Sequence, residues 1–527
     1  MAKTAAAPQP GSMGGFLGWV EKTGNRLPDP AFIFLYLIAA LVVVSLLADW
    51  AGLSAIHPTE KNADGSAKII AAMSLFAPEN IAKLWVDMPT TFTHFHPLGY
   101  VLVVMLGAGV AERTGLFAAA MRSAVRGAPK AMLTPMVAFV AMMGNLAADA
   151  AYVVLIPLAG VLYAAAGRHP IAGITAAFAG VSGGFSANLL PGQLDALLFG
   201  ITEAAAELIL PAWDANLAGN WYFISAMLVV FLPVIWFVTD KVIEPRLGDF
   251  TPETDAARLA TAEDKALDAS EKKGLGRAGL AALAVVALWG FFTLGPGTPL
   301  IDETAIGPAQ LTPFFRSLVA AFFVLFLAAG WAYGAAAGSI KTHRDAVKMM
   351  AAAMSDLGYY MVLAFFAAHF VAMFNWSNLG LIFAVQGAGA IKASGLPMPV
   401  LLTLMILLTA AVNLFVGSAS AKWALLAPVM VPMLMLLGVS PEATTAAYRV
   451  GDGATNIITP LMVYFPLILT FCQRWKADFG LGSLTAVMLP YSLWILISGL
   501  ILTFGWIALG LPLGPGAPAS FAMPSAG

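Results

Sequence analysis

The sequence has little charge and a single cysteine. Only 11% of its 527 residues are charged, whereas about a quarter are charged in a typical soluble domain, and the net charge is −2. A chain so poor in charge is typical of a membrane protein with several spans, and it offers no basic surface for nucleic acid. Cys472 alone excludes a disulfide framework and a thiolate metal cluster. The first 15 residues lack an apolar core, so we expect no removable signal peptide.

The sequence also lacks the signatures of an enzyme or an ATP-driven pump. No GxxxxGK[ST] motif is present, and no nucleophile–base set is visible, so we predict neither catalysis nor a cofactor. His94 and His96 share one side of an extended segment, but they have no third ligand nearby for a metal. His369 falls in an apolar run and is interpreted as a hydrogen-bonded core residue rather than a proton relay.

The chain is instead rich in apolar runs about as long as a bilayer is thick. We predict an all-α polytopic membrane protein with nine transmembrane helices, covering about residues 31–48, 98–116, 171–202, 221–239, 278–294, 313–337, 350–373, 443–473 and 482–509. Two further apolar runs, 131–166 and 398–437, are interrupted at the middle and are interpreted as re-entrant hairpins. Basic residues flank both ends of the first hairpin, which places both ends on one side of the membrane.

Charged segments divide the chain. Residues 1–30 end in a short basic amphipathic stretch that we expect on the cytoplasmic surface, so the N-terminus is predicted to be cytoplasmic. Residues 240–277 carry many charges of both signs and are interpreted as a cytoplasmic linker. The linker separates a first repeat, 31–239, from a second, 278–509, and residues 510–527 form a tail.

The two repeats share motifs in the same order. Gly144-Asn145 begins one hairpin tip and Gly417-Ser418 the other, and TAAFAGVSGGFSANLLP, from Thr175, aligns with TAAYRVGDGATNIITP, from Thr445. The basic residues give the repeats opposite orientations. Inverted repeats with paired Gly/Pro-broken helices, here about 171–202 and 443–473, point to the central binding site of a secondary transporter.

The second break carries charge that a lipid-facing helix would not. Arg449 and Asp452 lie between glycines and before Pro460, and a charge at mid-bilayer costs roughly 2.5–3.5 kcal/mol. We interpret Arg449 as a clamp for a substrate carboxylate, and Asp452 and Asp195 as proton or cation carriers. Two alternatives stay open: Arg449 and Asp452 could pair across one helical turn, and Asp195 could cap a helix.

Neutral oxygens near both breaks could hold sodium. The candidates for such a cation site are Asn145, Ser186, Asn188, Ser418, Thr455 and Asn456. These side chains could equally cap the broken helices. Trp423 could stack on an aromatic substrate or pack against a neighbouring helix.

One further hypothesis arises from the repeat. Asp149 lies five residues after Gly144, and Lys422 lies five residues after Gly417, so the two hairpins carry opposite charges at equivalent positions. We expect these charges to pair across the hairpins or to guard opposite sides of the site. The alternative is that each has an unrelated partner.

Several long segments resemble the AbgT family of transporters, named for p-aminobenzoyl-glutamate transport. They are GFLGWVEKTGNRLPDP, GFSANLLPGQLDALLFGITEAAA, NLFVGSASAKWALLAPVMVPML and SPEATTAAYRVGDGATNIITPLMVYFPLI, and the resemblance runs nearly end to end. The sequence departs from the family pattern at Ala196, where the family often has proline, and at Pro191.

The resemblance implies a bacterial inner-membrane homodimer with an ion-coupled transport mechanism, using H⁺ or Na⁺. It implies import of p-aminobenzoyl-glutamate or export of p-aminobenzoate-like compounds and sulfonamide antimetabolites. It adds a functional role for Asn413, Ser420 and Pro441 to those of Asp195, Trp423, Arg449, Asp452 and Pro460. A channel or an intramembrane enzyme is a more remote alternative. A channel would not need paired broken helices, and an enzyme would need a nucleophile–base or metal set.

Overall fold

The computed structural model describes residues 30–62, 66–126, 129–147, 151–211, 213–248, 250, 267–294, 297–305, 310–459, 461–462 and 464–523. Almost all of its regular structure is helical, in agreement with the predicted fold class. Within these residues, seven helices are long and apolar enough to cross a membrane, and a bent helix pair adds an eighth candidate. The total of nine spans stays a prediction.

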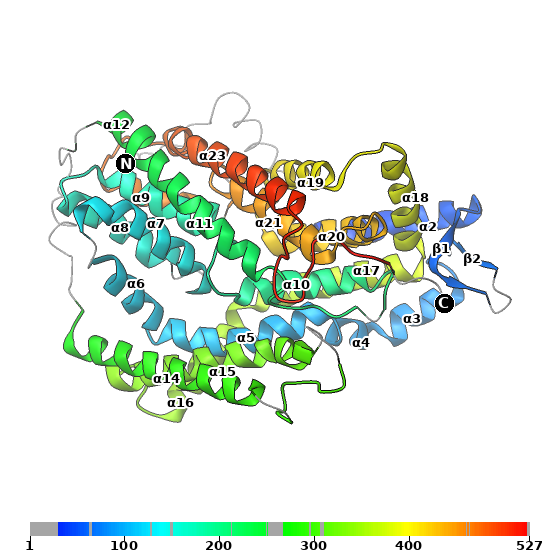
Figure 1. The fold of residues 1–527 in the computed structure, drawn as a ribbon, viewed down its shortest axis with the longest axis horizontal. Coiled ribbons are helices and arrows are strands. Elements are labelled where there is room, and N and C mark those ends of the chain that lie inside the picture. The colour runs from blue at the N-terminus through cyan, green and yellow to red at the C-terminus, as the bar shows by residue number, and fades with distance from the viewer. Residues whose placement is uncertain are drawn as a thin grey trace, which may run out of the picture.

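The helices form two layers that face each other across a gap between the ribbons in Figure 1. One layer contains α5 (His96–Arg113), α14 (Ala269–Thr293), α15 (Thr312–Ala337) and α16 (His343–Asp356). Small residues bring these helices close: a Cβ placed on Gly330 of α15 would lie 2.7 Å from the backbone of Ala111 on α5. Such contacts let backbones approach where lipid supplies no hydrophobic drive between helices.

The other layer holds the segments predicted as hairpins and broken helices. Its first half contains α7 (Leu133–Met143), α8 (Ile156–Ala165), α9 (Pro170–Phe178), the π-helix η4 (Ala179–Gly183), α10 (Gln193–Ala206) and α11 (Trp221–Phe237). Its second half contains α19 (Met398–Asn413), α20 (Ala419–Leu436), α21 (Pro441–Asn456), α22 (Phe465–Gln473) and α23 (Leu481–Ala508). Helix α21 lies against α10, α19, α20, α23 and η4, so it is at the centre of this layer.

The segment after the first span contains the one sheet in the described residues. Helix α2 (Pro30–Trp50) leads into an antiparallel hairpin of β1 (Ser54–Lys61) and β2 (Ala67–Ala71), then α3 (Pro78–Val86) and α4 (Met88–Thr93). The predicted spans, which end at about residue 48 and resume at about 98, leave this stretch without a membrane helix. The hairpin projects beyond the helices at one end of the molecule (Figure 1), and a hairpin of this size leaves the fold essentially all-α.

Several boundaries differ from the prediction. Helix α6 (Leu116–Arg126) bends away from α5 by 63°, and α16 is a separate helix before α17 (Gly358–Trp376). Helix α18 (Leu379–Ala393) lies in a stretch left without a span. Helix α14 begins inside the predicted linker, because Asp268 caps it and accepts a hydrogen bond from the Glu271 amide.

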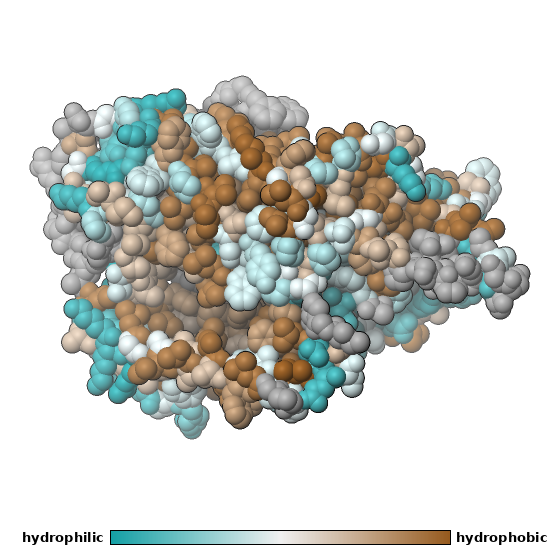
Figure 2. Space-filling view, viewed as in Figure 1, coloured by the Kyte–Doolittle hydropathy of each residue, from teal (hydrophilic) through white to brown (hydrophobic). Residues whose placement is uncertain are grey.

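Brown, apolar side chains cover much of the visible face in Figure 2, and teal polar residues gather toward its rim. The same view shows a hollow between the two layers on this face. This distribution is what a polytopic membrane protein requires, since lipid must contact apolar side chains.

Candidate functional site

Helix α21 is buried along its whole length although it carries charge. Ser440 caps it by accepting a hydrogen bond from the Ala443 amide at 3.0 Å, and Pro441 occupies its first position, where no amide donor is needed. The helix ends at Asn456, and α22 begins only at Phe465. Pro460, predicted to mark this break, lies outside the described residues.

Arg449 joins the two halves of this layer. Its Nη2 lies 2.7 Å from Oδ1 of Asp195 on α10, and its Nε donates to Oδ1 of Asn220 at 3.1 Å. The side chain is 1% exposed and its guanidinium lies 5.8 Å from the Phe199 ring centroid. Arg449 therefore pairs with Asp195, and not with Asp452 one turn away as the local alternative held.

Asp195 has two tasks. Its Oδ1 receives Arg449, and its Oδ2 accepts the Gly192 amide at 2.7 Å, which caps the start of α10. The two interpretations of Asp195, as a charged site residue and as a helix cap, both describe contacts that this carboxylate makes. One side chain thus both caps the start of α10 and neutralises the Arg449 charge on α21.

Asp452 forms a second buried ion pair, with Lys422 on α20. Both residues are at most 1% exposed, and the Lys422 ammonium also donates to Oδ1 of Asn413. The Asn413 amide in turn donates to the Asp452 carbonyl at 2.6 Å and to Thr455 Oγ1 and Asn456 Oδ1, both at 2.9 Å. This cluster ties α19, α20 and α21 together.

One member of the predicted hairpin charge pair, Lys422, has its partner within the second repeat. Asp149 lies outside the described residues, so its proposed pairing with Lys422 stays a prediction. The partner that the structure gives Lys422 is Asp452, a residue of the second break.

Trp423 lies in the interior of the layer. Its Nε1 donates to Thr202 Oγ1 at 2.9 Å and to the Leu198 carbonyl at 3.1 Å. Its ring centroid lies 4.5 Å from that of Tyr448, and it is 0% exposed. The indole therefore packs between α10 and α21 in this conformation, with no free face for a substrate ring.

One serine of the second hairpin caps a helix. Ser418 precedes α20 and accepts a hydrogen bond from the Ala421 amide at 3.3 Å. Its Oγ also lies 3.2 Å from that of Ser420. The side-chain oxygens of Thr455 and Asn456 accept hydrogen bonds from Asn413. In the second half of the predicted cation site, the side-chain oxygens therefore already have hydrogen-bond partners within the protein.

The first half of the predicted cation site keeps unpaired oxygens. Asn145 donates to the carbonyls of Met142 and Gly184, at 3.1 and 3.3 Å, while its buried Oδ1 has no hydrogen-bond partner. Ser186 Oγ is also buried without a partner. Asn188, by contrast, donates to the Met142 carbonyl and accepts from the Leu190 amide, both at 3.2 Å.

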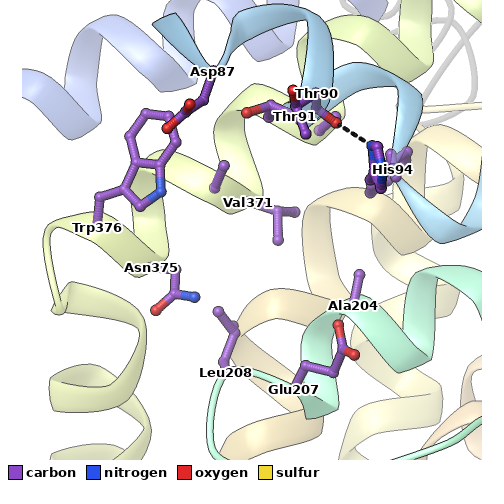
Figure 3. Close-up of a pocket in the computed structure, with 13 residues that line it drawn as sticks. Asp87, Thr90, Thr91, His94, Ala204, Glu207, Leu208, Val371, Asn375 and Trp376 are labelled. Carbon is purple, nitrogen blue, oxygen red and sulfur yellow. Dashed lines mark hydrogen bonds between the residues drawn. The ribbon is translucent and has the colours of Figure 1, made fainter. Parts of the chain in front are cut away.

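The histidines do not assemble a metal site in the part of the chain that the structure describes, where no group of three or more potential His, Cys, Asp or Glu ligands occurs. His94 Nδ1 lies 3.2 Å from the Thr90 carbonyl (Figure 3). The side chain of His96 lies outside the described part. His369 is buried and its Nδ1 lies 2.7 Å from the Phe365 carbonyl.

Cavities lie near both ends of α10. One, of about 460 Å³, lies among α4, the C-terminal part of α10 and α17, where Asp87, Glu207 and Asn375 are near its walls (Figure 3). The second, of about 230 Å³, is next to the start of α10. Neither is lined by the four buried residues Lys422, Trp423, Arg449 and Asp452.

Sequence reasoning missed the neutral partners of the charged residues. Asn220 donates to the Glu442 carbonyl at 2.9 Å while it accepts from Arg449, and Thr202 links Trp423 to Thr445. Their signal in the sequence is a single amide or hydroxyl at the edge of an apolar run. That signal does not identify a partner more than 200 residues away.

The arrangement has clear counterparts among known proteins. The family model described as the AbgT putative transporter family matches residues 15–521. The p-aminobenzoyl-glutamate transport protein of Escherichia coli (strain K12) is 35% identical over 512 residues, which cover 97% of this chain and 98% of that protein.

Two solved structures share the fold. The YdaH transporter of Alcanivorax borkumensis has a TM-score of 0.85 and 41% identity, with 93% of this chain and 100% of that chain covered. MtrF of Neisseria gonorrhoeae, described as illuminating a class of antimetabolite efflux pumps, has a TM-score of 0.88 and 42% identity, with 96% and 100% covered. This chain is therefore a membrane transporter that belongs to the AbgT putative transporter family.

Proposed function

We propose that the protein is an ion-coupled secondary transporter of p-aminobenzoyl-glutamate or related aromatic carboxylates in the bacterial inner membrane. The observation that carries this proposal is that two buried ion pairs, Arg449–Asp195 and Lys422–Asp452, join the central helix α21 to its neighbours. A stable core does not need them, because a buried pair often contributes no net stability over apolar residues of similar size. Intramembrane charges of this kind are the usual mark of a substrate or ion pathway.

The Lys422–Asp452 pair is suited to coupling. A proton or a sodium ion that neutralises Asp452 removes the partner of the Lys422 ammonium, so the cluster of Asn413, Lys422 and Asp452 must rearrange. A proton or a sodium ion that neutralises Asp195 would likewise remove the partner of the Arg449 guanidinium. Binding of a coupling ion at either carboxylate would thus favour a different packing of α21 against α10 and α20, which is the requirement for alternating access.

Arg449 is proposed as the group that binds a substrate carboxylate in another state of the cycle. In the present state its guanidinium is neutralised by Asp195 and shielded from water. A substrate carboxylate would replace the Asp195 carboxylate, and Asp195 would then be available for a coupling proton. This exchange links substrate binding to the ion without any additional group.

Uptake into proteoliposomes tests the proposal. Labelled p-aminobenzoyl-glutamate is supplied under an imposed proton gradient or sodium gradient, each in both directions. Accumulation above equilibrium under one gradient is expected, and it identifies the ion and the direction. Equal levels with and without either gradient would reject ion coupling.

The second candidate is proton-driven export of sulfonamide antimetabolites and p-aminobenzoate-like compounds. The likeness to MtrF, whose description names antimetabolite efflux, favours it. Cells that express the chain would then survive a sulfonamide dose that kills cells expressing Asp452→Asn. A homodimer with a cytoplasmic N-terminus is part of both proposals, and native mass spectrometry together with an N-terminal reporter fusion tests these features.

A further inference from the structure

The cavity of about 230 Å³ lies between the two layers. One wall comes from α5 and the start of α17, with Val101, Met105, Leu357 and Tyr360, and the other comes from the break between α7 and α8, the loop after η4 and the start of α10, with Asn145, Tyr152, Phe185, Gln193, Leu194 and Leu197. We propose that this cavity binds the neutral aryl-amine end of the substrate, while the carboxylate end is bound elsewhere. The inference rests on the proposed function, because it assigns a part of the same substrate.

The walls suit a flat apolar group. Seven of the ten lining residues have an aliphatic or aromatic side chain, and Tyr360 is not counted among them. The Tyr152 ring stacks on the Tyr464 ring, with 4.3 Å between the ring centroids and 13° between the ring planes. The stacked pair holds the Tyr152 ring in a fixed orientation beside the cavity. Small-molecule sites commonly combine such walls with a few polar groups that fix orientation.

Two lining residues have unsatisfied polar atoms. The Tyr360 hydroxyl and Asn145 Oδ1 are buried, and neither has a hydrogen-bond partner. The Asn145 amide nitrogen is held by the carbonyls of Met142 and Gly184, so its Oδ1 is left as an acceptor. A buried acceptor without a partner is costly, and a ligand that donates an N–H group would relieve that cost. An aryl amine has such a group on the edge of a ring.

The charge of the lining excludes the acidic end of the same ligand. None of the ten lining residues is Lys, Arg or His, and none is Asp or Glu. A carboxylate in this cavity would lose its water without gaining a positive partner, which is unfavourable. The nearest side of α10 carries Gln193, Leu194 and Leu197 toward the cavity, whereas Asp195 on the same helix pairs with Arg449. The start of α10 thus presents neutral side chains to the cavity and its carboxylate to Arg449.

Competition binding tests the assignment on the full-length protein in nanodiscs. Labelled p-aminobenzoyl-glutamate is displaced with p-aminobenzamide, a neutral aryl amine, and with benzamide, which lacks the amine. We expect p-aminobenzamide to compete at least roughly 5-fold better, the effect of one hydrogen bond to a buried acceptor. Equal competition by the two amides would overturn the proposal.

Two variants locate the site. Tyr360→Phe removes an unpartnered hydroxyl, so the fold loses no contact, and we expect the affinity for p-aminobenzamide to fall roughly 3- to 10-fold. Leu197→Trp fills the cavity and should reduce binding further. The matched controls are Tyr359→Phe, next in sequence on α17 but not a lining residue, and Leu493→Trp at a 50% exposed position on α23.

The results separate this proposal from the function it refines. Unchanged affinity in both Tyr360→Phe and Leu197→Trp, with gradient-driven uptake intact, would overturn the cavity assignment alone. The expected loss of affinity, in a protein that never accumulates substrate against a gradient, would overturn ion-coupled transport and leave the cavity as a binding site.

Discussion

Arg449 Nη2 and Asp195 Oδ1 lie 2.7 Å apart although the two residues are separated by 254 positions in the sequence. The pair connects α21, which ends at the second predicted break, with α10, which follows the first. Because both side chains are almost fully buried, each charge depends on the other for its neutralisation. This dependence can be tested separately for stability and for transport.

Asp195→Asn should destabilise the protein by about 3–5 kcal/mol, because it leaves the Arg449 guanidinium buried without a counter-charge. The double variant Asp195→Asn/Arg449→Gln should recover most of that loss, since no unpaired charge remains. Thermal unfolding in detergent measures the stability. Transport should be lost in both variants, and a double variant that regains transport along with stability would show that the pair is only structural.

Lys422→Met should uncouple transport. Without the ammonium, Asp452 and Asn413 lose the charge that organises them, and the binding of a coupling ion no longer changes the packing around α21. We expect accumulation against a gradient to disappear while exchange of labelled for unlabelled substrate continues. Lys392→Met, on the exposed end of α18, is the control. Normal accumulation by Lys422→Met would remove Lys422 from the coupling mechanism.

Gly453→Ala should damage both folding and transport. An added Cβ would lie 2.6 Å from the carbonyl oxygen of Gly183, which is backbone and cannot rotate away. Overpacking of this kind costs roughly 1–3 kcal/mol. Gly276→Ala in α14 has no atom within 4 Å of the new Cβ, and it should be neutral or stabilising by up to about 1 kcal/mol. Similar melting temperatures for the two variants would contradict the close approach.

Arg168→Lys should lower stability by about 1–2 kcal/mol. Arg168 follows α8 and binds Glu244 through Nε at 3.0 and 3.1 Å, Asp240 at 2.6 Å and Thr134 at 2.8 Å, which an ammonium cannot reproduce. These bonds raise the pKa of Arg168 although burial acts in the opposite direction. Arg316→Lys, in the exposed pair with Asp214, should change the melting temperature far less.

Sequence reasoning located the charged residues of the core but not their partners. Arg449, Asp452 and Lys422 are conspicuous because charge is costly in an apolar run, and glycines next to them indicate a broken helix. The pairing of Arg449 with Asp195 over Asp452 depends on how α21 packs against α10, which no local pattern encodes. The neutral partner Asn220 was missed for the same reason.

Two of the boundaries that differ, those of α6 and α16, have a common cause. Hydropathy finds helices that lipid surrounds, so α2 and α15 lie close to their predicted ranges. Helices α6 and α16 have one polar face, and they were therefore absorbed into a loop or a neighbouring span. Trp423 illustrates the limit for a single side chain: its residue type fits stacking on a substrate, while its contacts with Thr202 and Tyr448 occupy it in this conformation.

The contact between Gly453 and Gly183 has a mechanical consequence. Two backbones that meet without side chains have no rotamers to repack, and a carbonyl oxygen fills the space between them. Sliding one past the other would require both helices to separate, so α21 and η4 are expected to travel as one rigid body. Movement must then occur at other contacts of α21, and those with α10 and α20, which hold the two buried ion pairs, are the contacts that binding of an ion would loosen.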